Sequence, residues 1–274
     1  MDGPGNRYVL FLQGCNFDCL NCHNPHTINA CNDCGVCIEV CAPGALQLGV
    51  RGMEFTPSLC TGCDECLVAC PFDSSPMVVE RTVADILAEL ERAAAFLSGI
   101  TVSGGEPTQQ LDFLLELFRA IKQRGDLSHL TTFVDSNGSL ELADWDRLAP
   151  WLDGAMLDLK SATPELHEFI TGQPNAPVLA SIHHLFRLGK LHELRLLAIP
   201  GLTDTDEELA AFASTIREID SGIRLVVNAF RHHGVRASGR RWPEATDETV
   251  RSVVDRLRGH GLSNVVGPVL SLSL

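Results

Sequence analysis

The stretch "GCNFDCLNCHNP" at residues 14–25 decides how the rest of the chain is interpreted. It places Cys15, Cys19 and Cys22 in a C-x3-C-x2-C run that closes on His-Asn-Pro. A structural zinc site or an ordinary iron-sulfur cluster normally takes four protein ligands. A tight group of three cysteines therefore either borrows a distant residue or leaves one metal position open.

All eleven cysteines lie within the first 70 residues of the 274-residue chain. Such crowding, an odd count and the lack of an export signal favour metal ligation over disulfides, because cytoplasmic thiols are kept reduced. The formal charge is −14, with 21 Lys and Arg against 35 Asp and Glu, so nucleic acid is not an expected partner. No apolar run is long enough to cross a bilayer. We expect no membrane association and a cytoplasmic location.

The rest of the sequence alternates short apolar runs with amphipathic segments, which is typical of strand-helix repeats. Strands are expected at residues 7–13, 99–104, 131–138, 154–160, 193–201 and 223–230. Helices are expected at residues 82–97, 111–125, 143–152, 178–190, 206–219 and near 247–260, and an apolar tail follows from Val265. Thr82 and Asp204 resemble helix N-caps.

The strands are apolar nearly throughout, as in a parallel sheet covered by helices. The sequence thus predicts an α/β fold, an incomplete (β/α)6 barrel formed by residues 1–25 and 81–274, with an insertion at residues 26–80. Polar and Gly-rich residues gather at the C-terminal strand ends, the edge where barrels place their chemistry.

The insertion contains two C-x2-C-x2-C-x3-C runs, the spacing of bacterial two-cluster ferredoxins, in which the fourth cysteine of each run ligates the cluster of the other. One [4Fe-4S] cluster is therefore assigned to Cys31, Cys34, Cys37 and Cys70. The other is assigned to Cys60, Cys63, Cys66 and Cys41. A pair of zinc knuckles is the alternative, although zinc motifs usually separate two C-x2-C pairs by a longer loop.

With these eight cysteines assigned, no further thiol remains for Cys15, Cys19 and Cys22. Their spacing after the first strand resembles the signature of radical S-adenosylmethionine (SAM) enzymes. That resemblance implies a third [4Fe-4S] cluster, whose free iron holds the amino and carboxylate groups of SAM and whose electron cleaves SAM to methionine and a 5′-deoxyadenosyl radical. In "SGGEP" at residues 103–107, two glycines allow close backbone approach to a ligand, and Glu106 offers an anion to the methionine ammonium.

Four further stretches narrow the resemblance: "DGPG" at residues 2–5, "CHNP" at 22–25, "DSNG" at 135–138 and "MLDLK" at 156–160. The chain is similar to glycyl radical enzyme activating enzymes, and most to a YjjW-like branch whose insertion carries two ferredoxin-type clusters. The resemblance implies a SAM pocket made by Asn21, Cys22, His23, Gly104, Gly105, Glu106, Asp135, Asp158, Leu159, Lys160 and Arg231. It also implies a monovalent cation beside SAM, held by Asp135, Ser136, Met156 and Asp158.

The chain departs from the family pattern at some positions. Asn21 stands where many relatives put an aromatic residue against adenine, and Arg231 stands where they often have a His for the SAM carboxylate, with His232 as a rival. The paired His183 and His184 are expected to be ordinary helix residues. Relatives usually carry a short segment before "DGPG", which suggests that this chain starts late.

The resemblance implies an oxidoreductase that removes an α-hydrogen from a glycine of a partner glycyl radical enzyme. Electrons would come from the auxiliary clusters or from an external flavodoxin or ferredoxin. The glycine is expected on another protein, because the chain has no "RVxGY"-like segment. Two alternatives stay open: a radical SAM enzyme that modifies a peptide or small molecule, and a non-catalytic iron-sulfur electron carrier.

Overall fold

The computed structural model describes residues 3–267. Met1 and Asp2, which begin the chain and the "DGPG" stretch, lie outside the described residues, as does the predicted apolar tail from residue 268 onward. No helix in the described part of the chain is long and apolar enough to cross a membrane.

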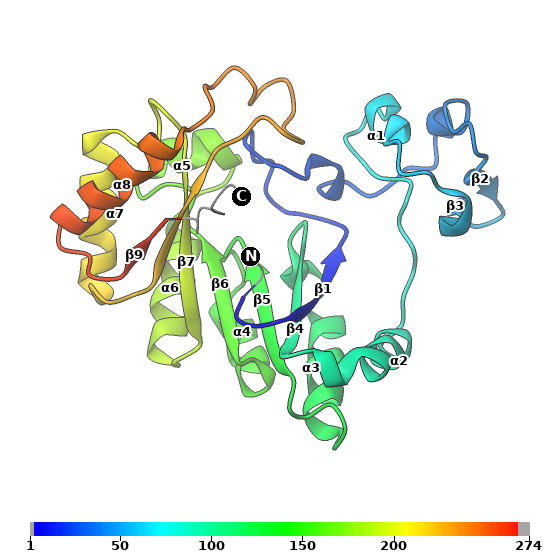
Figure 1. Ribbon diagram of the computed structural model, residues 1–274, viewed down its shortest axis with the longest axis horizontal. Coiled ribbons are helices and arrows are strands. Elements are labelled where there is room, and N and C mark those ends of the chain that lie inside the picture. Colours follow the sequence, from blue (N-terminus) through cyan, green and yellow to red (C-terminus); the bar gives the residue numbers. More distant parts are fainter. Residues whose placement is uncertain (1–2, 268–274) are drawn as a thin grey trace, which may run out of the picture.

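The main body is a seven-stranded parallel sheet in the order β1-β4-β5-β6-β7-β8-β9 (Figure 1). Six strands fall where the sequence predicts them: β1 Arg7–Leu12, β4 Gly99–Gly104, β5 Thr131–Ser136, β6 Gly154–Asp158, β7 Leu191–Ala198 and β8 Leu225–Ala229. The short β9, Val265–Val266, adds a seventh strand at the start of the apolar tail. Within the described residues, the two ends of the sheet, β1 and β9, are not paired with each other, so this part of the chain forms an open barrel.

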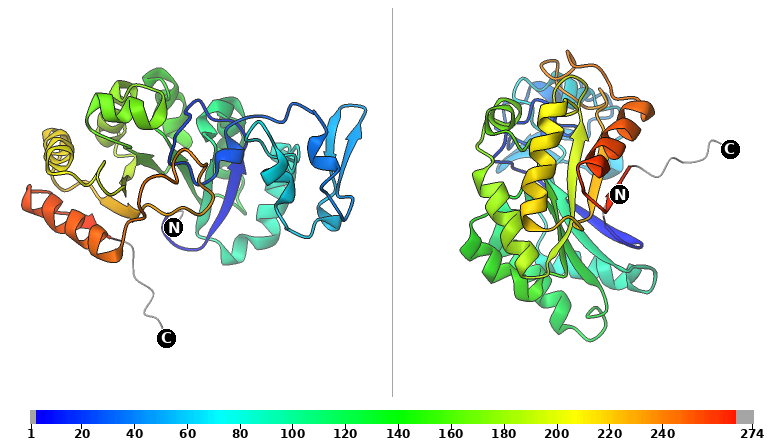
Figure 2. Two further views of the ribbon diagram at one scale, coloured as in Figure 1. Left: turned by 90° about the horizontal axis from the view of Figure 1, so that it is seen from above. Right: turned by 90° about the vertical axis from the view of Figure 1, so that its left-hand side faces the viewer.

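The helices lie along the outer side of the curved sheet (Figure 2). Those predicted from the sequence are α2 Val83–Ala93, α3 Leu111–Gln123, α4 Leu142–Leu148, α6 Ala176–Arg187, α7 Asp206–Ile219 and α8 Asp247–Gly259. Among the helices along the sheet, α5 Pro164–Thr171 was not predicted. Short 3-10 turns extend three of the connections: η4 Ala94–Phe96, η5 Pro107–Gln110 and η6 Ala149–Trp151.

The two predicted N-caps have different outcomes. Thr82 caps α2 through a reciprocal capping box with Asp85, as expected. The prediction for Asp204 is wrong, because Thr205 accepts the capping hydrogen bond from the Glu208 amide. Asp204 instead accepts a hydrogen bond from the amide of Gly201 and fixes the turn before the helix.

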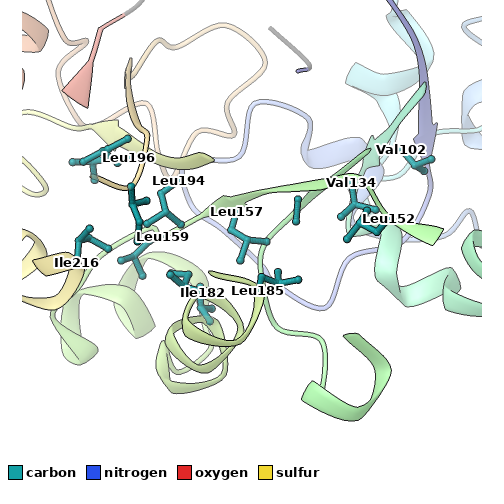
Figure 3. Packing of buried hydrophobic residues seen from close by; sticks show 14 of the residues in the cluster. Val102, Val134, Leu152, Leu157, Leu159, Ile182, Leu185, Leu194, Leu196 and Ile216 are labelled. Atoms are coloured by element: carbon teal, nitrogen blue, oxygen red, sulfur yellow. The ribbon is translucent and has the colours of Figure 1, made fainter. Parts of the chain in front are cut away.

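The hydrophobic core lies between the sheet and its helices (Figure 3). Alternate strand residues such as Val134, Leu157 and Leu194 belong to it. Val134 lies beside Leu152, and Leu157 lies near Ile182 and Leu185 of α6. Because side chains alternate across a strand, the intervening positions face the concave side of the sheet. That face carries polar and charged residues.

Residues 26–80 lie beside β1 and away from α7 and α8 (Figures 1 and 2). They contain the antiparallel hairpin β2 Leu46–Gly49 and β3 Gly52–Phe55, the short helix α1 Glu65–Ala69, and three 3-10 turns, η1 Pro25–Thr27, η2 Val36–Ile38 and η3 Pro57–Leu59. Cys37, Leu46 and Cys66 form a small apolar cluster of their own. A bridge between Asn29 and Ser74 brings the two ends of the segment together.

Candidate active site

A cavity of about 680 Å³ opens at the C-terminal edge of the sheet, within the range of pockets that hold cofactors and small molecules. The cysteine loop between β1 and η1 forms one side of it, and the ends of five strands form the rest. Its lining includes Cys15, Cys19, Asn21, Cys22, His23, Ser103, Gly104, Gly105, Asp135, Ser136, Asn137, Asp158, Lys160, Arg195, Asn228, Arg231 and Asp247. Most of the site residues predicted from the sequence therefore meet in one place.

Backbone hydrogen bonds hold the cysteine loop on both sides. On the insertion side, the amide of Gly14 donates to the carbonyl of Thr27 (2.8 Å) and the amide of Cys15 to the carbonyl of Ile28 (3.0 Å). On the barrel side the hydrogen bonds run from Asp18 to Thr171 (3.0 Å) and from Leu20 to Ile170 (2.8 Å). The second pair shows the role of α5: carbonyl groups in its last turn accept hydrogen bonds from two backbone amides of the cysteine loop.

The two glycines of "SGGEP" bring the second strand end against this loop. Gly104 has φ +118°, and a Cβ there would collide with the backbone of Leu12. A Cβ on Gly105 would fall against the carbonyl oxygen of Gly14 and 2.6 Å from that of Thr27. The predicted close backbone approach is therefore to the cysteine loop, while both glycines still border the cavity.

Glu106 differs from its predicted role as an anion facing the ligand. It is 1% exposed and does not line the cavity. Its carboxylate accepts hydrogen bonds from the amide and hydroxyl of Thr108, the hydroxyl of Ser136 and the amide of Asn137, at 2.6–3.1 Å. Burial raises the pKa of Glu106, and these hydrogen bonds act against that shift. The residue ties the β4 end to the β5 end, which explains why it turns away from the cavity.

The three thiols differ from free surface cysteines. Burial raises the pKa of Cys15 to about 11 and that of Cys19 to about 12, and it also raises the pKa of Cys22. Lys160 interacts electrostatically with all three. A thiol ligand binds metal as the thiolate, so occupation of this loop by iron would release protons.

Two polar atoms on the same loop are buried and have no hydrogen-bond partner among residues 3–267: Oδ1 of Asn21 and Nε2 of His23. Both residues line the cavity. The His23 ring stacks on Phe230, at 6.1 Å between ring centroids. Burial lowers the pKa of His23, so its ring is neutral near pH 7. Unsatisfied buried polar atoms are rare, and these two indicate a polar ligand in this part of the cavity.

Arg231 and His232, the two residues considered for contact with the SAM carboxylate, lie in different surroundings. Arg231 lines the cavity, donates to the carbonyl of Ala245 at 2.5 Å and lies 3.8 Å from Asp247. His232 bonds the carbonyl of Trp242 at 2.7 Å and is not among the lining residues. The geometry thus favours Arg231.

The paired histidines on α6 are ordinary helix residues, as predicted. His183 is exposed, and His184 bonds Asp146 at 2.7 Å. Leu159, which the resemblance placed along SAM, is fully buried in the hydrophobic core and points away from the cavity.

The four side chains that the resemblance assigns to a monovalent cation lie close together but already have partners in the chain. Asp135 accepts from Arg195 Nη1 at 3.0 Å, and Met156 Sδ accepts from Arg195 Nη2 at 3.0 Å. Asp158 accepts from Lys160 Nζ at 2.6 Å, and Ser136 donates to Glu106 at 2.9 Å. These contacts do not test the predicted cation, but they place a guanidinium among its proposed ligands.

The two cavity aspartates differ in their ionisation. Burial raises the pKa of Asp135 to about 6, with Arg195 acting in the opposite direction. For Asp158, burial also raises the pKa, but the charges of Lys160 and Arg195 outweigh it and lower the pKa overall. At neutral pH both carboxylates are ionised and paired.

Arg195, Asn137 and Asn228 also line the cavity but were missed from the sequence. The sequence carries no clear signal for Arg195, because it is the strand register that places it opposite Asp158 of the neighbouring strand, on the concave face. Asn137 follows Ser136 in "DSNG". Its side-chain amide lies 4.0 Å from Cys15 Sγ.

The cysteines of the insertion line two other cavities. Cys41, Cys60, Cys63 and Cys66 border one of them, and Cys31, Cys34, Cys37 and Cys70 border the other. These are the two sets that the ferredoxin spacing predicts. Within the described residues, no three His, Cys, Asp or Glu side chains form a group suited to a single metal ion.

Comparison with known proteins defines the class of the chain. Residues 9–213 match the radical SAM superfamily, and the chain belongs to it. It is 31% identical to the isethionate sulfite-lyase activating enzyme of Desulfovibrio desulfuricans, over 79% of this chain and 75% of the relative. It is 30% identical to the pyruvate formate-lyase-activating enzyme of Streptococcus mutans, over 85% of this chain and 74% of the relative. Within the superfamily, it is one of the glycyl radical enzyme activating enzymes.

Solved structures support the fold at lower identity. A domain of pyruvate-formate lyase-activating enzyme from Bacteroides vulgatus matches 62% of this chain and 98% of its own, with a TM-score of 0.51 and 16% identity. Streptococcus suis SuiB bound to its precursor peptide SuiA matches 97% of this chain with a TM-score of 0.60 and 14% identity. The matched region is 49% of SuiB, so this chain spans about half of that protein.

Proposed function

We propose that this enzyme binds a [4Fe-4S] cluster through Cys15, Cys19 and Cys22, cleaves SAM reductively and generates a glycyl radical on a partner enzyme. One observation carries the proposal: three thiols and two unpartnered polar atoms border a single cavity at the barrel edge. The sequence relatives named as activating enzymes support the choice of a glycyl radical enzyme as the partner.

The bound cluster would supply one electron that breaks the C5′–S bond of SAM, and the deoxyadenosyl radical would then take one hydrogen atom from the α-carbon of a partner glycine. The residues of the chain would hold the cluster and orient SAM. The amide of Phe17 donates to Cys15 Sγ at 3.4 Å, which helps to fix that ligand. Hydrogen bonds to sulfur and local charge set the potential of such clusters.

The cavity residues would position SAM through charge and hydrogen bonds. Arg231 suits the methionine carboxylate, because a guanidinium can donate two parallel hydrogen bonds. Asn21 Oδ1 is an acceptor, so it suits an amino group of the ligand. This would give Asn21 a polar role at the position where relatives place a ring.

We further propose that residues 26–80 form a ferredoxin-like module with two more [4Fe-4S] clusters, for three in total. The two cysteine-lined cavities support this assignment, since each combines three cysteines of one run with the fourth of the other. The module would pass electrons from a flavodoxin or ferredoxin in the cytoplasm to the barrel site.

The first test compares two cysteine variants after anaerobic reconstitution. Wild type should hold about 12 iron atoms, and Cys22→Ala and Cys34→Ala should each hold about 8, because each loses one cube. Only Cys22→Ala should abolish reductive SAM cleavage, whereas Cys34→Ala should retain part of it. A wild-type content near about 4 iron atoms, or stoichiometric zinc, would refute the two-cluster module.

The second test concerns the partner. Any glycyl radical enzyme found encoded beside this chain would be mixed with the reconstituted protein, SAM and a reductant, and the mixture examined by electron paramagnetic resonance. A glycine-centred doublet that is absent with Cys22→Ala is expected. SAM cleavage without that doublet, but with modification of a peptide or small molecule, would favour the other class of radical SAM enzyme.

A further inference from the structure

Arg195 lies at the centre of the concave face of the sheet. Its side chain is 13% exposed and contacts residues on three adjacent strands. Nη1 donates to Asp135 on β5 and Nη2 to Met156 Sδ on β6, both at 3.0 Å. Nε donates to Glu193, two residues earlier on β7, at 2.8 Å. The strand register explains this arrangement, because Asp135 pairs with Met156 and Asp158 pairs with Arg195.

The charges that border the cavity are already balanced within the chain. Three carboxylates and three cationic groups line it: Asp135, Asp158, Asp247, Lys160, Arg195 and Arg231. Each carboxylate has a cationic partner, at 3.0 Å for Asp135, 2.6 Å for Asp158 and 3.8 Å for Asp247. A metal cation placed beside Asp135 would meet the Arg195 guanidinium and would be repelled by it.

The donor set also fits a guanidinium. Arginine keeps its charge when buried and presents a planar group with five donors. In this site, the two Nη atoms of the Arg195 guanidinium donate to the Asp135 carboxylate and the Met156 thioether on neighbouring strands. Its Nε donates to Glu193.

We propose that Arg195 supplies, as a fixed part of the chain, the positive charge that the family resemblance assigns to a monovalent metal ion beside SAM. Arg195 would be a positioning residue: it holds the Asp135 carboxylate in place and gives that side of the cavity a permanent positive charge. This inference rests on the proposed function, in that the site concerned is the SAM pocket. Its consequence is that SAM cleavage does not need Na⁺ or K⁺.

The experiment uses Arg195→Met, which removes the charge but keeps much of the length, and Arg195→Lys, which keeps the charge. The matched control is Arg224→Met. Arg224 contacts the other oxygen of Glu193 at 3.2 Å, is 44% exposed and does not line the cavity. Circular dichroism melting curves would show whether each variant folds.

Cation binding is measured first, by thallium-205 NMR titration with Tl⁺ and competition by K⁺, on protein without and with reconstituted iron. Wild type and Arg224→Met should show no saturable, K⁺-competed site. Arg195→Met should acquire one, because Asp135 and Met156 lose their cationic partner. Saturable, K⁺-competed binding by wild type would overturn the inference.

SAM cleavage is then measured with Na⁺, K⁺ or tetramethylammonium as the sole monovalent cation. Wild type, Arg195→Lys and Arg224→Met should each vary by less than about twofold among the three salts. Arg195→Met should fall by about tenfold or more in tetramethylammonium and recover in part with K⁺. Two results would contradict the inference. One is a wild-type rate that falls by about tenfold in tetramethylammonium, and the other is an Arg195→Met rate with the same salt dependence as that of Arg224→Met.

The two proposals fail in different ways. If no protein cleaves SAM in any salt, the proposed function is wrong, and the thallium titration still decides the role of Arg195. If Arg195→Met does not fold, the wild-type and Arg195→Lys measurements decide it.

Discussion

Cys15, Cys19 and Cys22 stand at the rim of a cavity of about 680 Å³, whereas the insertion cysteines surround two cavities of about 20 and 10 Å³. Both regions thus gather cysteine thiols, but only the first leaves room for a second molecule. Besides its cysteines, the cavity of about 20 Å³ is bordered largely by apolar residues, among them Leu46, Phe55 and Met77.

The support of the two regions differs in the same way. The barrel loop is fixed by backbone contacts to α5, η1 and the β4 end, and charged side chains stand opposite it. The insertion cysteines sit on short turns around a minimal apolar cluster. Sites that position a substrate need rigid support and charge, whereas a site that only transfers electrons needs closed coordination. The contrast assigns substrate chemistry to the barrel loop.

The largest effect is expected from Gly105→Ala. The new methyl group would collide with the carbonyl oxygens of Gly14 and Thr27, so the "SGGEP" turn and the cysteine loop would have to separate. We expect SAM cleavage to fall by about a hundredfold or more, since misplacing reacting groups by about 1 Å can cost that much. The rate is measured on reconstituted protein.

The matched control is Gly62→Ala in the insertion, between Cys60 and Cys63. Gly62 has φ +68° but no atom within 4 Å of an added Cβ, so the change costs only backbone strain, about 1 kcal/mol. It should preserve SAM cleavage within about threefold. Equal losses in the two variants would mean that the barrel loop is not specially supported.

A smaller effect is expected where the two regions are joined. Arg236, on the loop after β8, bonds the carboxylate of Asp18 at 2.5 Å and the carbonyl of Cys19 at 3.2 Å, and it reaches Asp73 of the insertion at 3.4 Å. Arg236→Met should reduce kcat/KM for SAM by about tenfold, because charged hydrogen bonds contribute about 1.5–3 kcal/mol each. Steady-state SAM cleavage measures it.

Asp73→Asn distinguishes the contact of Arg236 with the insertion from its contacts with the cysteine loop. It weakens only the link to the insertion, so kcat/KM should change by less than about threefold, while the iron content stays at the wild-type value. If Asp73→Asn impairs cleavage as much as Arg236→Met, the insertion itself positions the cysteine loop.

The barrel could be predicted from the sequence because its signals are periodic. Six apolar runs and the amphipathic segments between them specify strands and helices, and the cysteine spacing specifies how the sulfurs group. The short α5 was missed because its eight residues carry too few apolar positions to establish a period.

The orientation of side chains at the strand ends could not be read in the same way. Glu106 was expected to face the ligand, but its carboxylate satisfies four donors from two turns that only the folded sheet brings together. Arg195 was overlooked because a lone arginine in an apolar strand indicates little until the register places it opposite Asp158.

The smallest expected effect tests whether acid weakens the barrel side of the comparison. His167 on α5 is fully buried, its Nδ1 bonds the carbonyl of Gln173 at 2.9 Å, and its ring meets Phe17 of the cysteine loop edge-on. Burial lowers the pKa of His167. The unfolded chain therefore takes up a proton first, near its ordinary pKa of about 6.5.

The titration of His167 therefore leaves the free energy of unfolding unchanged well above about pH 6.5. It lowers that free energy as the pH drops from there toward the lowered pKa of His167 in the folded chain. His167→Gln, which cannot titrate, should remove this loss, amounting to about 1 kcal/mol between about pH 8 and pH 5.5. Urea unfolding of wild type and variant at the two pH values measures the difference. His183→Gln on the exposed face of α6 is the control and should keep the wild-type dependence. An identical acid loss in His167→Gln would show that the proton is taken up by another group, such as His23 or His192, whose pKa burial also lowers.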